Sequence, residues 1–163
     1  MTALTSTFVN TTKKNKGFTF TEFAIVAVLM AAAAYFIYPA LQAGQQNAKV
    51  DDALRQVSTL LSAAQKYGPK NGDKTGISMQ AIAERGLIPD TMGTGANAGV
   101  GANPWNGDIT MAVDTADQTQ VEIEFQGIDD DEAGLRFEDE LNGSYAESAS
   151  YASGTLTLIL NAG

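Results

Sequence analysis

Residues 18–41 read FTFTEFAIVAVLMAAAAYFIYPAL, a run of 24 residues whose single charged side chain is Glu22. As an α-helix this run would be about 36 Å long, which exceeds the roughly 30 Å hydrocarbon core of a bilayer. A helix buried in a globular core is normally shorter and amphipathic, whereas this one is apolar on every side. The run therefore predicts a membrane span.

Charge is distributed unevenly around this span. The preceding segment, residues 1–17, contains Lys13, Lys14 and Lys16 and no acidic residue. The rest of the chain carries all 19 acidic residues and seven of the ten basic ones. Basic residues beside a span remain on the cytoplasmic side, so we expect a cytoplasmic N-terminus and a single pass through the membrane. The acidic C-terminal part would then lie on the far side.

The composition excludes several classes of site. The 163-residue chain has no cysteine and no histidine. It therefore has no thiolate nucleophile, no disulfide, no Ser-His-Asp triad and no Cys/His zinc site. A formal net charge of −9 argues against nucleic acid as a main partner, because phosphate binding needs clustered Lys and Arg. Structural proteins, binding modules and carboxylate or hydroxyl enzymes remain.

Glu22 is an acidic residue inside a predicted span, which is costly and marks a functional site by default. One interpretation places Glu22 in the interface, with its carboxylate reaching the lipid headgroups. The other interpretation gives it a cationic partner. Cleavage after Gly17 would create one, the free amine of Phe18, about one helical turn away in the same helix. Between two helices offset along their axes, that amine and Glu22 would instead neutralise each other across the interface.

The stretch KGFTFTEFAIVAVLMAAAAYFIYPAL, residues 16–41, resembles the N-terminal signature of type IV pilins. In that family a prepilin peptidase cleaves after the glycine and methylates the new N-terminus. The resemblance implies cleavage between Gly17 and Phe18, N-methylation of Phe18, and subunit assembly through Phe18 and Glu22. The family's proline matches Pro39, which removes one backbone hydrogen bond from the helix and would act as a hinge.

The same resemblance implies the function and the partners. The chain would be a structural subunit, a major pilin that polymerises into an extracellular type IV pilus for conjugation or adhesion. It would be neither an enzyme nor a cofactor protein. Its partners would be the prepilin peptidase, the pilus assembly machinery, the inner membrane before assembly, and further copies in a helical homo-oligomer. The long leader and the stretches 77–92 and 103–111 are similar to type IVb pilins, especially those of plasmid-encoded thin conjugative pili.

Two alternatives remain open at this point. A minor pilin or a type II secretion pseudopilin would share the N-terminal signature and differ in abundance. An uncleaved, membrane-anchored acidic binding module would share only the span.

Beyond the span the pattern becomes amphipathic, and Gly68-Pro69 ends the predicted helix at about Tyr67. Apolar residues recur at steps of three and four, at Val50, Leu54, Val57, Leu61 and Ala64. One face of this stretch should pack under a globular head. The predicted organisation is a leader (1–17), a helical spine (18–67) and a head (68–163), together an α+β type IV pilin fold.

The head sequence predicts two helices and three strands. A short helix begins after Ser78 as N-cap, and a second begins in the acidic run 129–132 and ends at Asn142. Alternating apolar residues predict strands at 109–113, 121–125 and 156–160, the first two as an antiparallel hairpin. The glycine-rich stretch 93–107 is predicted to be an exposed loop, and it lacks the ending of a phosphate-binding loop.

The acidic side chains of the head were also considered as ligands. Asp114, Asp117 and the run 129–132 offer oxygen atoms suited to calcium, but they lack EF-hand spacing. We interpret them as turn and helix-cap residues on a solvated face, with no metal site and no catalytic pair. Four serines are candidate exposed hydroxyls for glycosylation: Ser144, Ser148, Ser150 and Ser153.

Overall fold

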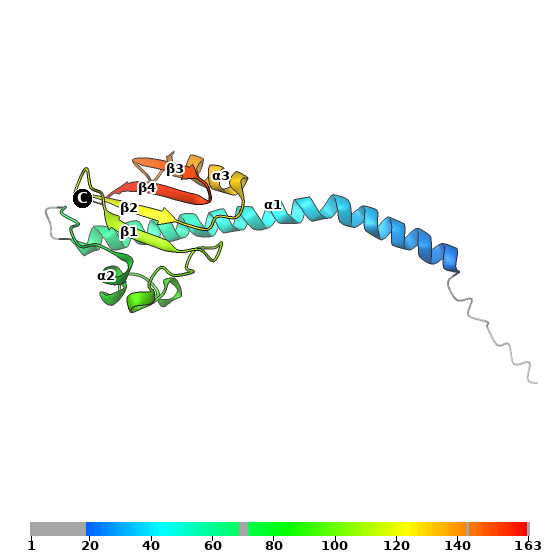
Figure 1. Ribbon diagram of the computed structural model, residues 1–163, viewed down its shortest axis with the longest axis horizontal. Helices are drawn as coiled ribbons and strands as arrows, with labels where there is room; N and C mark the ends of the chain where they lie inside the picture. Colours follow the sequence, from blue (N-terminus) through cyan, green and yellow to red (C-terminus); the bar gives the residue numbers. More distant parts are fainter. Residues whose placement is uncertain (1–18, 69–71, 143, 163) are drawn as a thin grey trace, which may run out of the picture. The chain divides into compact units, whose positions relative to one another are not determined.

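The computed structural model describes residues 19–68, 72–142 and 144–162. Gly17, Phe18 and the predicted leader lie outside these residues. The chain divides into two compact units between Ala40 and Leu41. Helix α1 (Phe20–Tyr67) contributes to both units and ends where the sequence predicts (Figure 1).

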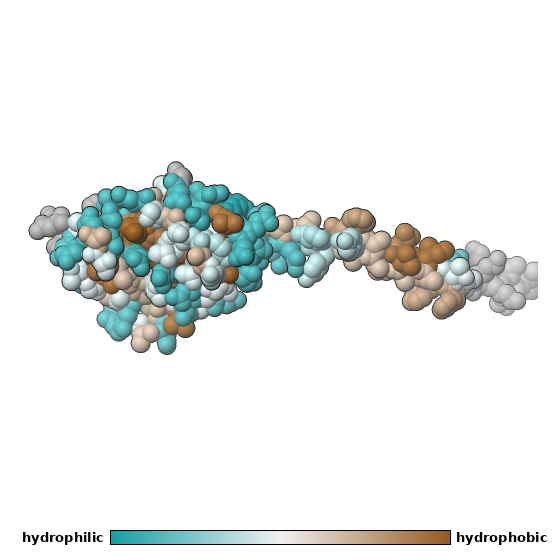
Figure 2. Space-filling view, turned by 45° about the horizontal axis from the view of Figure 1, so that its top comes forward, coloured by the Kyte–Doolittle hydropathy of each residue, from teal (hydrophilic) through white to brown (hydrophobic). Residues whose placement is uncertain are grey.

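The first unit is the apolar part of α1. Every residue from Thr19 to Ala40 is exposed, including large side chains such as Phe20, Leu29 and Phe36. These apolar residues colour the helix brown in Figure 2. Among the described residues, α1 alone is long and apolar enough to cross a membrane. The predicted span is therefore present as a helix with its apolar surface uncovered.

The second unit begins with the amphipathic part of α1. The face that it buries comprises Val50, Ala53, Val57, Leu60, Ala63 and Ala64. Leu54 and Leu61 are half-buried and flank this face. The sequence pattern also includes Ala53, Leu60 and Tyr67 as residues that widen this stripe, and the amphipathic prediction is confirmed.

The sheet has four antiparallel strands in the order β1-β2-β4-β3. They are β1 (Ile109–Val113), β2 (Gln120–Phe125), β3 (Ser148–Ala152) and β4 (Thr155–Asn161). Ile123 lies opposite Met111 on one side and Leu158 on the other, and all three are buried. The three predicted strands and the hairpin are confirmed. The prediction of three strands omitted β3, whose sequence SASYA has too little apolar alternation to signal a strand.

Helix α3 (Asp131–Asn142) precedes β3 and packs on the core. Asp130 caps it, accepting a 2.9 Å hydrogen bond at Oδ1 from the Ala133 N–H. Phe137 and Leu141 are fully buried, and the Phe137 ring meets that of Phe125 edge to face at 5.3 Å. The predicted acidic start and the end at Asn142 are confirmed. Together with the long helix and the sheet, α3 gives the expected α+β class.

The segment between α1 and β1 contains α2 (Met79–Glu84) and two single turns, η1 (Asp90–Met92) and η2 (Gly95–Asn97). Ser78 caps α2 as predicted, because its Oγ accepts a 3.1 Å hydrogen bond from the Ala81 N–H. Helix α2 contacts β1, so this segment covers the outer side of that edge strand.

The prediction that 93–107 is simply an exposed loop was wrong. Asn103 and Trp105 are buried, and so is Gly99, whereas Gly101 is exposed. Asn103 Oδ1 accepts hydrogen bonds from the Trp105 and Gly107 N–H groups, each 2.9 Å long. Its Nδ2 donates to the Gln126 carbonyl at 2.6 Å. One buried amide thereby holds the end of the loop on the sheet, which glycine and asparagine content alone does not reveal.

Candidate functional site

Glu22 lies in the first turn of α1, where it forms a reciprocal cap with Thr19. The Thr19 backbone N–H donates a 2.8 Å hydrogen bond to Glu22 Oε2. In return, Thr19 Oγ1 accepts a 3.3 Å hydrogen bond from the Glu22 N–H. The Thr19 hydroxyl also lies 2.9 Å from Oε2 and donates to it. This arrangement is a capping box, which satisfies two helix-terminal N–H groups that an apolar environment would otherwise leave unpaired.

Neither sequence interpretation of Glu22 included this contact. The signal was present, because Thr19-x-x-Glu22 has the spacing of a capping box in front of an apolar run. Among the described residues, Glu22 Oε1 makes no hydrogen bond, so one carboxylate oxygen is free of the cap. The carboxylate is thus oriented by its own helix and still has an oxygen to offer to another donor.

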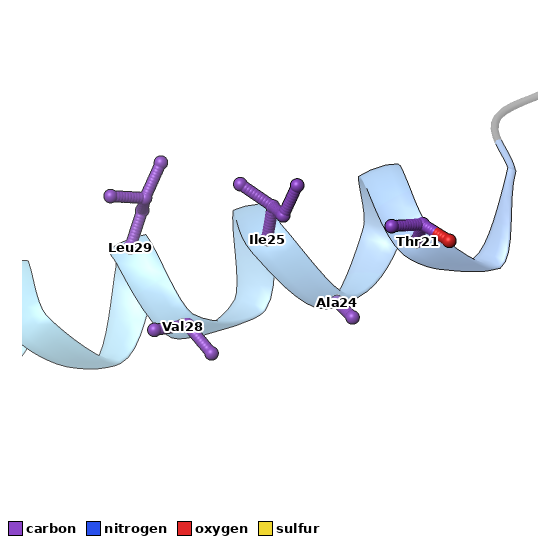
Figure 3. Close-up of a pocket in the computed structure, with 5 residues that line it drawn as sticks. All are labelled: Thr21, Ala24, Ile25, Val28 and Leu29. Atoms are coloured by element: carbon purple, nitrogen blue, oxygen red, sulfur yellow. The ribbon is translucent and has the colours of Figure 1, made fainter.

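A shallow apolar groove lies on the surface of α1 near the start of the helix (Figure 3). Thr21, Ala24, Ile25, Val28 and Leu29 line it, and their side chains project from successive turns of the helix. Small Ala24 between larger branched residues leaves a depression along the helix surface. Such a surface suits the close packing of a second helix, where small residues let backbones approach.

Pro39 lies inside α1, and the helix continues on both sides of it. Because proline has no N–H, the Tyr35 carbonyl lacks the hydrogen bond that another residue at position 39 would give it. The helix therefore has one missing backbone bond within its apolar part.

In the second unit, polar contacts fasten α1 to the head. The Trp105 Nε1–H donates a 3.0 Å hydrogen bond to Gln46 Oε1, and Gln46 Nε2 lies 3.4 Å from Asp129 Oδ1. Lys49 Nζ lies 3.6 Å from the same Asp129 oxygen. A single side chain, Gln46, therefore joins the 93–107 loop to the start of α3.

Arg136 of α3 makes a second connection to α1. Its Nη2 lies 3.7 Å from Asp51 Oδ1, and its Nη1 donates to Asn47 Oδ1. Its Nε also pairs with Glu140 at 2.7 Å within α3. These exposed pairs contribute little stability individually, but together they fix the rotation of α1 under α3.

Acidic residues that the sequence offers as calcium ligands make separate contacts within the head. Asp114 Oδ2 accepts the Asp117 N–H at 3.2 Å in the β1–β2 turn, Asp130 caps α3, and Asp131 Oδ1 accepts from the Tyr151 hydroxyl at 2.7 Å. In the described part of the chain, no three carboxylates converge as a metal site would require. The four candidate glycosylation serines are exposed.

The family model Bundlin, which describes type IV pilins, matches residues 42–153. The chain belongs to the Bundlin family. Its members are structural pilus subunits and not enzymes. The match covers the amphipathic helix and most of the head, and it stops short of the apolar signature at residues 16–41. No curated protein and no solved structure gave a significant match.

Membership in the Bundlin family confirms the resemblance to type IV pilins. The family match rests on residues 42–153, whereas the resemblance was drawn from the signature at residues 16–41. Pilins assemble into a filament of many subunits, so this chain's partners include other pilin subunits. Together with the exposed apolar helix, membership fits a membrane-anchored precursor and an extracellular pilus.

Proposed function

We propose that this chain is the major subunit of a type IV pilus, cleaved between Gly17 and Phe18 by a prepilin peptidase and N-methylated at Phe18. The observation that carries the proposal is a Bundlin head joined to an apolar helix whose single charge is Glu22. The leader 1–17 is removed, residues 18–67 form the spine, and residues 68–163 form the head. The N-terminus is cytoplasmic before assembly, and the pilus serves conjugation or adhesion.

In the proposed assembly, the apolar helices leave the inner membrane and pack against one another as the filament core. The contact is heterologous and repeats helically, because the same two surfaces join each successive subunit. The Phe18 amine of one subunit neutralises Glu22 of its neighbour. The capping box supports this pairing, because Thr19 engages Oε2 and leaves Oε1 for the incoming amine. The groove begins at Thr21, the residue before Glu22 in α1, and would receive the neighbouring helix.

The first test is the intact mass and N-terminal sequence of the mature protein, from cells with and without the prepilin peptidase. We expect loss of residues 1–17 and one added methyl group on Phe18 only when the peptidase is present. A protein that starts at Met1 in both cells would contradict the proposal, since the amine assigned to neutralise Glu22 would not exist. The chain would then be an uncleaved membrane-anchored binding module.

The second test separates the two roles of Glu22. Glu22→Gln keeps an oxygen that can accept the Thr19 N–H but removes the charge, whereas Glu22→Ala removes both. We expect both variants to be cleaved normally and both to lose most surface filaments, because the ion pair needs the charge. Glu132→Gln, at an exposed carboxylate of the head, is the matched control for the loss of one charge and should assemble.

Filament yield of Glu22→Gln equal to that of the unmodified chain would show that the cap, and not an ion pair, is the role of Glu22. Sheared surface material also distinguishes a major from a minor subunit. We expect filaments composed mainly of this chain. Filaments that contain it only in trace amounts would instead assign it as a minor pilin or pseudopilin.

A further inference from the structure

Strand β3 occupies one edge of the sheet, with β4 as its single strand neighbour. An edge strand presents backbone N–H and C=O groups on which another chain can add a strand. Proteins usually defend such edges with charged residues, proline or a bulge. The strand sequence SASYA contains no charged residue and no proline. Its register with β4 is continuous from Ser148 to Ala152, so the strand has no bulge. The defence of this edge must come from elsewhere.

Side chains of α3 occupy the outer edge of β3. Asn142 Oδ1 accepts a 2.7 Å hydrogen bond from the Ala149 N–H, and Asn142 Nδ2 donates to the Ala149 carbonyl at 3.1 Å. Glu138 Oε2 accepts the Tyr151 N–H at 3.1 Å. A strand paired with β3 would use the same three backbone groups. The Asn142 amide, which both donates and accepts, reproduces the two hydrogen bonds of one strand residue.

The Tyr151 side chain fixes the helix against the strand at a second point. Its hydroxyl donates a 2.7 Å hydrogen bond to Asp131 Oδ1 in the first turn of α3. Its ring lies on Gly134, where a Cβ atom would overlap it. Asp131, Gly134, Glu138 and Asn142 lie three, four and four residues apart, so they form one stripe along α3. The buried Phe137 and Leu141 on the adjacent face anchor this stripe in the core.

The opposite edge of the sheet is covered differently. The Ile109 N–H of β1 donates a 2.8 Å hydrogen bond to the Gly99 carbonyl, and α2 also contacts β1. Backbone at the first residue of β1 and a helix from the 79–107 segment therefore contact this strand. Side-chain mimicry of a paired strand is the particular device of the β3 edge.

We propose that Asn142 and Glu138 form an edge guard, which prevents β3 from pairing with β3 of a second copy of this chain. A second copy is the partner because β3 is self-complementary in an antiparallel arrangement. With Ser150 on the two-fold axis, Ala149 of one copy lies opposite Tyr151 of the other, and these are the residues whose outward groups the guard occupies. The proposal concerns the head alone and does not rest on the assembly of a pilus.

The absence of cysteine from the sequence provides a clean probe. In the proposed pairing the two Ser150 residues form a non-hydrogen-bonded pair about 4.5 Å apart between Cα atoms, within range for a disulfide. The full-length chain carrying Ser150→Cys would be solubilised in detergent and oxidised, with and without Glu138→Ala plus Asn142→Ala. We expect the disulfide-linked dimer to rise at least about tenfold when the guard is removed, because three backbone groups lose their partners.

The matched control is Glu132→Ala plus Asp139→Ala in the same Ser150→Cys chain. Both residues are exposed on α3, away from the stripe. The control removes two acidic residues, one more than the guard variant, and likewise leaves alanine at two positions of the helix. We expect it to remain monomeric, like the Ser150→Cys chain alone. A control that dimerises as strongly as the guard variant would overturn the proposal, because net charge and not the guarded edge would then prevent association.

Amide hydrogen exchange reports whether the guard was removed without unfolding α3. The Ala149 and Tyr151 amides should exchange faster, while the Phe137 and Leu141 amides stay protected. Faster exchange at β3 without more dimer would overturn the proposal. If the double variant loses protection throughout α3, the two single variants are compared instead. Dimer formation should be greater for Asn142→Ala, which removes two hydrogen bonds, than for Glu138→Ala, which removes one. Dimer levels in both single variants equal to that of the Ser150→Cys chain would reject the edge guard.

Discussion

The indole N–H of Trp105 donates a 3.0 Å hydrogen bond to Oε1 of Gln46, across 59 residues of sequence. Trp105 is 6% exposed, and its ring lies 6.0 Å from that of Phe137. The contact joins α1, the 93–107 loop and α3 through two side chains. It explains how a glycine-rich segment becomes a fixed part of the head.

Replacement of Gln46 by leucine should destabilise the head. The Trp105 N–H would lose its acceptor while the ring stays buried, and an unsatisfied buried donor costs about 1–3 kcal/mol. The measurement is the free energy of unfolding of the detergent-solubilised chain, followed by tryptophan fluorescence. Gln45→Leu, at an exposed neighbouring position, is the control and should change this free energy little. Equal effects of the two variants would count against the Trp105 contact.

Thr19→Val should weaken the start of α1 without affecting cleavage. Valine keeps the shape of the side chain but loses the hydroxyl that accepts the Glu22 N–H, and loss of an N-cap typically costs about 1 kcal/mol. We expect faster amide exchange at Glu22 in detergent and a smaller loss of filaments than for Glu22→Ala. Thr59→Val, which removes a hydroxyl from the amphipathic part of α1, is the matched control. Unchanged exchange at Glu22 would mean that the capping box contributes nothing measurable.

Pro39→Ala tests the proposed hinge. Alanine restores an N–H that can reach the Tyr35 carbonyl, so the apolar part of α1 should gain a backbone hydrogen bond. We expect slower amide exchange between Tyr35 and Leu41 and filaments that extend less under force. Filaments with unchanged dimensions and unchanged extension would show that no hinge operates at this position.

Gly134→Ala should destabilise the head, although alanine is the better helix former by about 1 kcal/mol. The new methyl group would overlap the Tyr151 ring, and overpacking of this kind costs about 1–3 kcal/mol. The measurement is a double-mutant cycle of unfolding free energies with Tyr151→Ala, in which alanine at 134 should become neutral or favourable. Leu135→Ala, at an exposed site, is the control. A cycle with no coupling would mean that the ring moves aside freely.

The elements that the sequence predicted correctly have strong apolar periodicity. The stripe from Val50 to Ala64 and the alternation in β1, β2 and β4 each specify one buried face. Strand β3 lacks that pattern. Pairing with β4 and hydrogen bonds from side chains of α3 hold it in place instead. Contacts of this kind join residues far apart or on different elements, so no local window of sequence contains them.

At the candidate site, too, local features were predictable from the sequence and contacts between distant residues were not. Glu22 was conspicuous because one charge in 24 apolar residues is visible in composition. Its cap by Thr19 also has a sequence signature, the four-residue spacing of a capping box. The burial of Asn103 and Trp105 had no comparable signal, because it depends on the Gln126 carbonyl and on Gln46 in other elements.

Acid should weaken the head through Asp117, which lies in the β1–β2 turn. The Thr119 N–H and hydroxyl donate to Asp117 Oδ1 at 2.9 and 2.8 Å, and these bonds hold the pKa of the carboxyl below its ordinary value of 3.8, the backbone bond having the larger effect. Hydrogen bonds from Thr75 lower the pKa of Asp73 in the same way.

A carboxyl whose pKa is lower in the folded chain stabilises the fold fully above its unfolded pKa. That stability is lost as the pH falls from about 3.8 through the folded value. We therefore expect the unfolding free energy to fall in this window, and to fall less steeply in Asp117→Asn, which cannot titrate. Asp90→Asn is the control and should follow the unmodified chain. Parallel curves for Asp117→Asn and the unmodified chain would show that the turn does not contribute to acid sensitivity.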